Sequence, residues 1–125
     1  LDFVGLSGLH DRPPSTLPFG KQRLLELARA LMTKPRLLLL DEPASGLNDH
    51  EVEGFMVLLE SIRAKGISIL LVEHNMRVVM GLADEIVVLD FGRKIAEGTP
   101  SEIRQNEEVL EAYLGSGNKN SEALA

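Results

Sequence analysis

The sequence predicts an α/β fold with a mainly parallel sheet. Two short, mainly apolar runs are typical of buried strands: Leu37–Leu40, which lies between Pro35 and Pro43, and Ile67–Val72, which follows Gly66. A segment with helical spacing lies between them, and this strand–helix–strand order joins parallel strands through a crossover. With 125 residues, of which 44% are hydrophobic and 26% charged, the chain is at most one globular domain or a piece of one.

The N-terminal elements follow from local signals. Leu1–Gly5 is expected to form the last turn of a helix, with Gly5 as its left-handed cap. Ser7–Thr16 has the composition of a loop. Gly20–Thr33 follows as an amphipathic helix, and Pro35 stops it before the first strand. The apolar positions of this helix are Leu24, Leu27, Ala28, Leu31 and Met32.

The central helix has a clear start and end. Asn48 is expected to be its N-cap, with Glu51 in the capping-box position three residues later. The helix is predicted to run to about Lys65 and to end at Gly66. Its expected buried residues are Phe55, Leu58, Leu59 and Ile62.

The C-terminal part predicts a short helix, a hairpin and two further short helices. The first helix covers Asn75–Leu82, and Ser101 and Glu107 open the last two. Glu85–Asp90 and Arg93–Glu97 are expected to pair through the turn Phe91-Gly92. Asp90-Phe91-Gly92 also spells a kinase magnesium motif, but no other kinase motif accompanies it, so a hairpin turn is the better interpretation.

Charge and composition exclude several classes of function. The net charge of −6 argues against non-specific binding to nucleic acid or to anionic lipid. The absence of cysteine excludes disulfides and thiolate metal sites. No apolar run approaches the ~18 residues that span a bilayer, and there is no signal peptide. The start at Leu1 rather than at methionine fits a processed or truncated product.

The run Leu37–Pro43, which reads LLLLDEP, predicts a catalytic strand end. A buried strand would deliver Asp41 and Glu42 to its carboxyl edge, where open α/β sheets bind ligands. Adjacent side chains leave a strand in different directions, so the two carboxylates are expected to have different tasks. Asp41 can hold Mg²⁺, directly or through water, while Glu42 can orient or deprotonate an attacking water.

Two further patterns indicate phosphate chemistry. In Leu17–Arg23, Gly20 permits close backbone approach and the helix N-terminus presents free N–H groups to an anion, with Lys21 and Arg23 adding positive charge. His74 directly follows the second strand, which predicts that it lies in the same layer as Asp41 and Glu42.

Taken together, these motifs resemble those of the ABC ATPase family in order and spacing, over roughly Leu1 to Gly115. The resemblance implies the C-terminal half of a P-loop ABC ATPase domain over residues 1–115. The Gly-, Ser-, Asn- and Lys-rich composition predicts a flexible tail over 116–125. The resemblance implies that Asp41 is the magnesium-site aspartate, Glu42 the catalytic carboxylate and His74 the switch histidine at the γ-phosphate. It also implies a signature loop that contacts the ATP of a partner subunit (Leu17, Pro18, Phe19, Gly20, Lys21, Gln22) and a loop that couples two subunits (Ala44–Asn48, with Ser45, Gly46 and Asn48).

The sequence departs from the family pattern in three ways. Pro18, Phe19 and Lys21 replace the serine, first glycine and glutamine of the usual signature, and Lys21 is expected to supply part of the lost interaction as a point charge. Asn48 stands where the family often has aspartate, so a role there that needs a carboxylate is in doubt. No P-loop is present, because the one Gly-Lys pair is followed by Gln22. The chain alone is therefore expected to lack ATPase activity.

The motifs look most like those of the ATPase subunits of bacterial branched-chain amino-acid importers. The resemblance implies ATP and Mg²⁺ as cofactors and a head-to-tail dimer of ATPase subunits. It also implies a transmembrane permease as partner, no nucleic acid, and a cytoplasmic location on the inner face of the plasma membrane. The permease and a binding protein would choose the substrate. Two alternatives remain open: a non-catalytic module that binds a permease or a complete ATPase, and a non-transport ABC-type ATPase, although no heptad run of a coiled coil is present.

Overall fold

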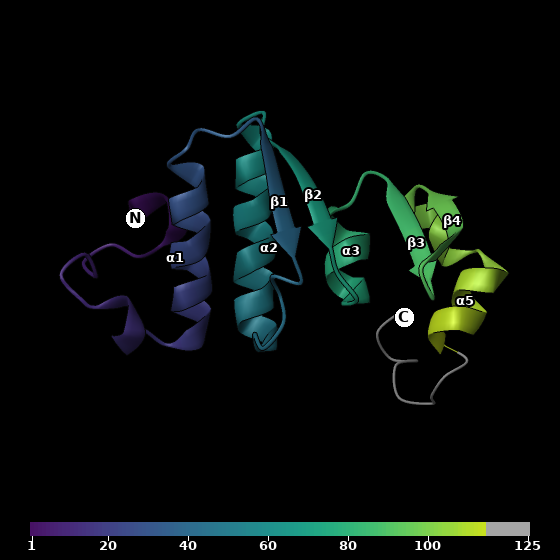
Figure 1. Ribbon diagram of the computed structural model, residues 1–125, viewed down its shortest axis with the longest axis horizontal. Helices are drawn as coiled ribbons and strands as arrows, with labels where there is room; N and C mark the ends of the chain where they lie inside the picture. The colour runs from purple at the N-terminus through teal and green to yellow at the C-terminus, as the bar shows by residue number, and fades with distance from the viewer. Residues whose placement is uncertain (115–125) are drawn as a thin grey trace. The chain divides into compact units, whose positions relative to one another are not determined.

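The computed structural model describes residues 1–114, and the chain divides into two compact units, each of which is described by itself (Figure 1). Unit 1 comprises Leu1–Glu73, and unit 2 begins at His74. The tail predicted over 116–125 lies outside the described residues. None of the helices in residues 1–114 has both the length and the apolar composition needed to cross a bilayer.

Unit 1 contains the elements that carry the predicted motifs. Figure 1 shows α2 lying between α1 and a pair of strands. The helix predicted over Gly20–Thr33 is confirmed as α1, with shifted ends, and Gly5 has the expected left-handed conformation. The elements of unit 1 are the 3₁₀ turns η1 (Asp2–Val4) and η2 (Pro14–Thr16), then α1 (Phe19–Leu31), β1 (Leu37–Asp41), α2 (Asp49–Ala64) and β2 (Ser68–Val72).

The two strands of unit 1 pair in parallel, as the sequence predicts. Their register runs from Leu37 opposite Ser68 to Asp41 opposite Val72. The expectation that both strands are buried holds only in part for the described chain, because burial alternates along each strand. Helix α2 lies on one face of the pair (Figure 1), and within unit 1 no element covers the other. We call the uncovered face the open sheet face; its apolar residues are Leu37, Leu39, Leu70 and Val72.

Helix α2 supplies more buried residues to the core of unit 1 than any other element. Its buried residues recur three or four positions apart, which places them on one stripe of the helix. They are Val52, Phe55, Leu59 and Ile62. Leu58 was predicted to be buried but is only half-buried, because it lies beside this stripe rather than on it. The capping box at Asn48 and Glu51 is confirmed.

Unit 2 is a hairpin covered by short helices. Its elements are α3 (Met76–Leu82), β3 (Ile86–Asp90), β4 (Arg93–Gly98), α4 (Pro100–Arg104) and α5 (Glu107–Leu114). The predicted antiparallel pairing through Phe91-Gly92 is confirmed; both turn residues have positive φ, 44° and 76°, as a two-residue hairpin turn requires. A buried cluster joins the hairpin to the last two helices through Ile86, Val88, Ile103 and Val109.

An exposed ion pair on β4 changes two pKa values in unit 2. The Lys94 ammonium donates a 2.6 Å hydrogen bond to Glu97; this bond and the charge attraction raise the pKa of Lys94 and lower that of Glu97. The small contribution of the pair is present at neutral pH. It is lost as the pH falls through the folded-state pKa of Glu97, or rises through that of Lys94.

Candidate functional site

Asp41 and Glu42 lie at the carboxyl end of β1, both exposed. Asp41 is the last residue of the parallel ladder, opposite Val72. The Glu42 N–H donates a 2.8 Å hydrogen bond to the Val72 carbonyl, so the backbone pairing extends one residue beyond the strand. Glu42 then turns sharply, with φ of 43°. A left-handed backbone at a residue other than glycine costs about 1–3 kcal/mol and persists only where the surroundings enforce it.

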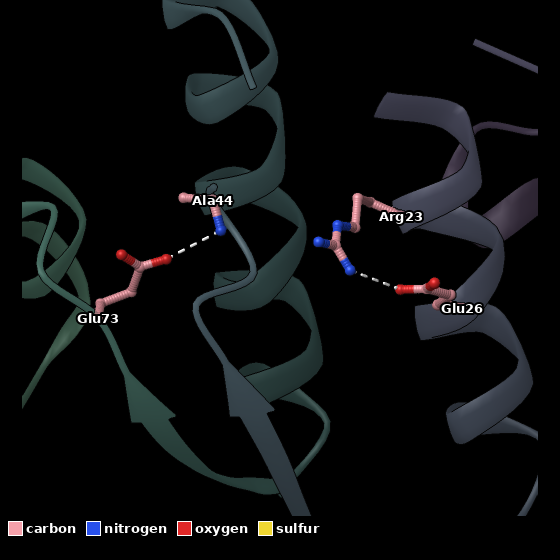
Figure 2. Close-up of polar contacts among 4 residues, drawn as sticks. All are labelled: Arg23, Glu26, Ala44 and Glu73. Atoms are coloured by element: carbon pink, nitrogen blue, oxygen red, sulfur yellow. Dashed lines mark hydrogen bonds and ion pairs between the residues drawn. The ribbon is translucent and has the colours of Figure 1, made fainter. Parts of the chain in front are cut away.

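The loop after Glu42 is held at both ends. Within it, the Ser45 N–H donates to the Glu42 carbonyl at 3.1 Å. Across the sheet, the Ala44 N–H donates a 2.8 Å hydrogen bond to the Glu73 carboxylate, which directly follows β2 (Figure 2). The loop therefore has a defined conformation, set in part by a residue 29 positions away in the chain.

Asn48 ends this loop and opens α2. Its side-chain oxygen accepts the Glu51 N–H at 2.9 Å, and its own N–H donates to the Glu51 carboxylate at 3.0 Å. The residue that departs from the family pattern therefore acts as a helix cap here, a role that an amide fills as well as a carboxylate does.

The predicted signature loop forms the start of α1. Leu17 is buried, and Pro18 is the N-cap without a side-chain capping bond. The Gln22 side chain donates to the Leu17 carbonyl at 2.8 Å, so it stabilises the entry to the helix. Lys21 is exposed, and its predicted interaction with a nucleotide stays a prediction.

Arg23 has local partners. Its guanidinium forms a 3.0 Å ion pair with Glu26 (Figure 2). The same guanidinium lies 5.0 Å from the centre of the Phe19 ring. The positive charge that the sequence assigned to the helix start is therefore partly neutralised by Glu26.

The signature loop and the loop before α2 pack against each other. A Cβ atom added to Gly46 would lie 2.8 Å from Cε1 of the Phe19 ring, and one added to Gly20 would collide with the carboxylate of Glu51. Unit 1 thus brings together residues 17–22 and residues 45–48, which the sequence had only assigned to two separate motifs. The sequence did not predict the contacts of Phe19 and Glu73. The one available signal for Glu73 was its position as a polar residue directly after the apolar strand β2.

The donor set fits a magnesium ion bound mainly by a nucleotide. In the described part of the chain, no three histidine, aspartate or glutamate side chains cluster as a metal cage. Mg²⁺ in nucleotide sites usually takes one or two carboxylates and completes its shell with water and phosphate oxygens. The exposed carboxylate of Asp41 matches that requirement. His74 begins unit 2, so its position relative to Asp41 stays a prediction.

Two family models and many known proteins match this chain. A model described as "ABC transporter" matches residues 1–45, and one described as "Branched-chain amino acid ATP-binding cassette transporter" matches residues 93–118. The high-affinity branched-chain amino acid transport ATP-binding protein BraF of Pseudomonas aeruginosa is 46% identical over 116 residues, and LivG of Escherichia coli is 45% identical over 116. The lipopolysaccharide export system ATP-binding protein LptB of Acidithiobacillus ferridurans is 36% identical over 115 residues.

Solved structures agree with these relatives. The ADP conformation of the ATP-binding cassette MJ1267 has a TM-score of 0.84 and 33% identity, over 93% of this chain and 47% of that one. A nucleotide-free ATP-binding cassette from an ABC transporter has a TM-score of 0.83 and 32% identity, over 90% of this chain and 46% of that one.

The fold and the motifs thus define an ABC-type ATP-binding cassette. The chain matches ABC transporter ATP-binding domains in sequence and in fold, and the resemblance inferred from its motifs is confirmed. The relatives at 45% and 46% identity are branched-chain amino acid transport ATP-binding proteins. The alignments cover 92% of this chain but only 46% of BraF and LivG, so the chain spans about half the length of the curated relatives it matches.

Proposed function

We propose that the chain is part of the ATP-hydrolysing subunit of an importer for branched-chain amino acids. Support for the transported class comes from BraF and LivG, whose identity of 45–46% exceeds the 36% of the lipopolysaccharide export protein. The observation that carries the hydrolytic role is the end of β1, where Asp41 is followed by Glu42 in a left-handed conformation.

The residues of the site have separate roles in this proposal. Asp41 binds the magnesium ion, which neutralises charge that develops on the phosphates. Glu42, turned away from the strand direction, orients or deprotonates the attacking water. His74 contacts the γ-phosphate. Because catalysis of phosphoryl transfer rests mainly on positioning and charge, a small displacement of Glu42 is expected to lower the rate.

The partners follow from the same proposal. Two ATPase subunits associate head to tail, so that the signature loop of residues 17–22 meets the ATP of the partner. The pair docks on a transmembrane permease at the cytoplasmic face of the plasma membrane. The P-loop motif is absent from the 125 residues, so hydrolysis requires the complete subunit that contains it.

The test is hydrolysis by the complete subunit with Glu42→Gln. Loss of a general base is expected to lower kcat about 10²–10⁴-fold while ATP binding persists. Glu60→Gln is the control, because Glu60 lies on α2 in an ion pair with Arg63 and has no role in the site. The 125-residue chain, assayed in parallel, is expected to be inactive. Full activity of Glu42→Gln would contradict the proposed role of the strand end.

A further inference from the structure

The turn that follows β1 has two hydrogen bonds to the end of β2. The Glu42 N–H donates to the Val72 carbonyl, and the Ala44 N–H donates to the Glu73 carboxylate, both at 2.8 Å. Val72 and Glu73 are consecutive, so one short segment holds the turn on both sides of Pro43. Figure 2 shows the Glu73 side chain reaching Ala44 from the segment that follows β2.

The two hydrogen bonds differ in whether they depend on a side chain. The Val72 bond uses a backbone carbonyl and would survive substitution there, whereas the Ala44 bond depends on the identity of residue 73. Proline has no N–H, so Pro43 cannot contribute a donor of its own to the turn. Ala44 is buried, with 6% of its surface exposed. Loss of the acceptor of a buried N–H destabilises the folded conformation, because the donor is left without a partner. The charge on Glu73 also makes this bond stronger than one to a neutral acceptor.

We infer that Glu73 is a positioning residue for Glu42. By accepting the Ala44 N–H, its carboxylate fixes the turn that keeps Glu42 at a φ of 43°, a conformation that needs external support. Glu73 itself does not touch the reacting atoms. The inference rests on the proposed function, since it assigns Glu73 to the hydrolysis in which Glu42 takes part.

The experiment compares Glu73→Ala and Glu73→Gln in the complete subunit. Glutamine keeps a side-chain oxygen acceptor at the same reach, whereas alanine removes it. Glu73→Ala is expected to lower kcat about tenfold to a hundredfold, with KM for MgATP changed less than about twofold. Glu73→Gln is expected to retain most of the rate. Glu60→Ala, on the exposed side of α2, is the matched control for loss of a glutamate.

A second readout does not depend on activity. Amide hydrogen exchange in the nucleotide-free subunit is expected to become at least about tenfold faster at Ala44 in Glu73→Ala, and to be nearly unchanged in Glu73→Gln. Unchanged exchange at Ala44 in Glu73→Ala would overturn the inference. A kcat that falls equally in Glu73→Ala and Glu73→Gln would overturn it as well. A wild-type rate in Glu42→Gln would instead refute the proposed function, while the exchange at Ala44 would still report whether Glu73 fixes the turn.

Discussion

Gly46 lies where the start of α1 meets the loop before α2. Its φ is +79°, and an added Cβ would lie 2.8 Å from the Phe19 ring. Gly46→Ala is therefore expected to lower the free energy of unfolding by about 2 kcal/mol, because the left-handed backbone and the ring contact both oppose a side chain. Chemical denaturation of the complete subunit measures this change.

The matched control for Gly46→Ala is another glycine of the same unit. Gly54 lies inside α2 with open space around it, so Gly54→Ala is expected to stabilise the protein by about 0.5–1 kcal/mol. In a Phe19→Ala background, Gly46→Ala should cost less, because only the backbone term is left. An equal cost in both backgrounds would show that the ring contact carries no energy.

At the scale of the residue, the positions of key residues in strands and loops could be predicted, but their contacts could not. The pattern of an apolar run followed by two carboxylates placed Asp41 and Glu42 at the end of a strand, whereas the loop over Ala44–Asn48 was assigned only through the family resemblance. The sequence did not predict the left-handed backbone of Glu42, because residues before proline ordinarily prefer extended conformations. It also missed the bond between Ala44 and Glu73, since nothing local reports a contact across 29 positions.

At the scale of the element, the capping box of α2 makes a specific prediction. Asn48→Ala removes the acceptor for the Glu51 N–H and leaves an unpaired donor at the helix start. The free energy of unfolding is expected to fall by about 1 kcal/mol. Urea denaturation, monitored by the helical circular dichroism signal, measures the loss.

Asn48→Asp separates capping from a specific need for the amide. Aspartate caps as well as asparagine does, and its charge interacts favourably with the helix dipole, so stability should be kept or raised by about 0.3–1 kcal/mol. A loss in Asn48→Asp equal to that in Asn48→Ala would contradict the capping explanation.

Element type was predictable because most of the signals are local. The start of α2 at Asn48 and the hairpin turn at Phe91-Gly92 both follow from side-chain capping and from residues that tolerate positive φ. Burial of the strands was not predictable in the same way. A continuous apolar run indicates a sheet covered on both faces, but whether a layer is present on each face is not encoded in the run itself. Leu39 is accordingly exposed and Leu38 buried.

At the scale of the whole molecule, the open sheet face is the main liability of unit 1. Leu39 and Leu70 are register partners, so their side chains are neighbours, with 65% and 59% of their surfaces exposed. Contiguous apolar surface and unpaired strand edges favour association between copies of a chain.

Replacing this apolar pair should therefore reduce aggregation of the 125-residue chain. The double variant Leu39→Thr/Leu70→Thr introduces β-branched side chains, which suit strands, while it removes apolar area from the open sheet face. Val57→Thr is the control, because Val57 is 63% exposed but lies on α2, away from the two strands. Light scattering against protein concentration is expected to show less self-association for the double variant only. Equal improvement by Val57→Thr would mean that general hydrophobicity, not the open sheet face, drives the association.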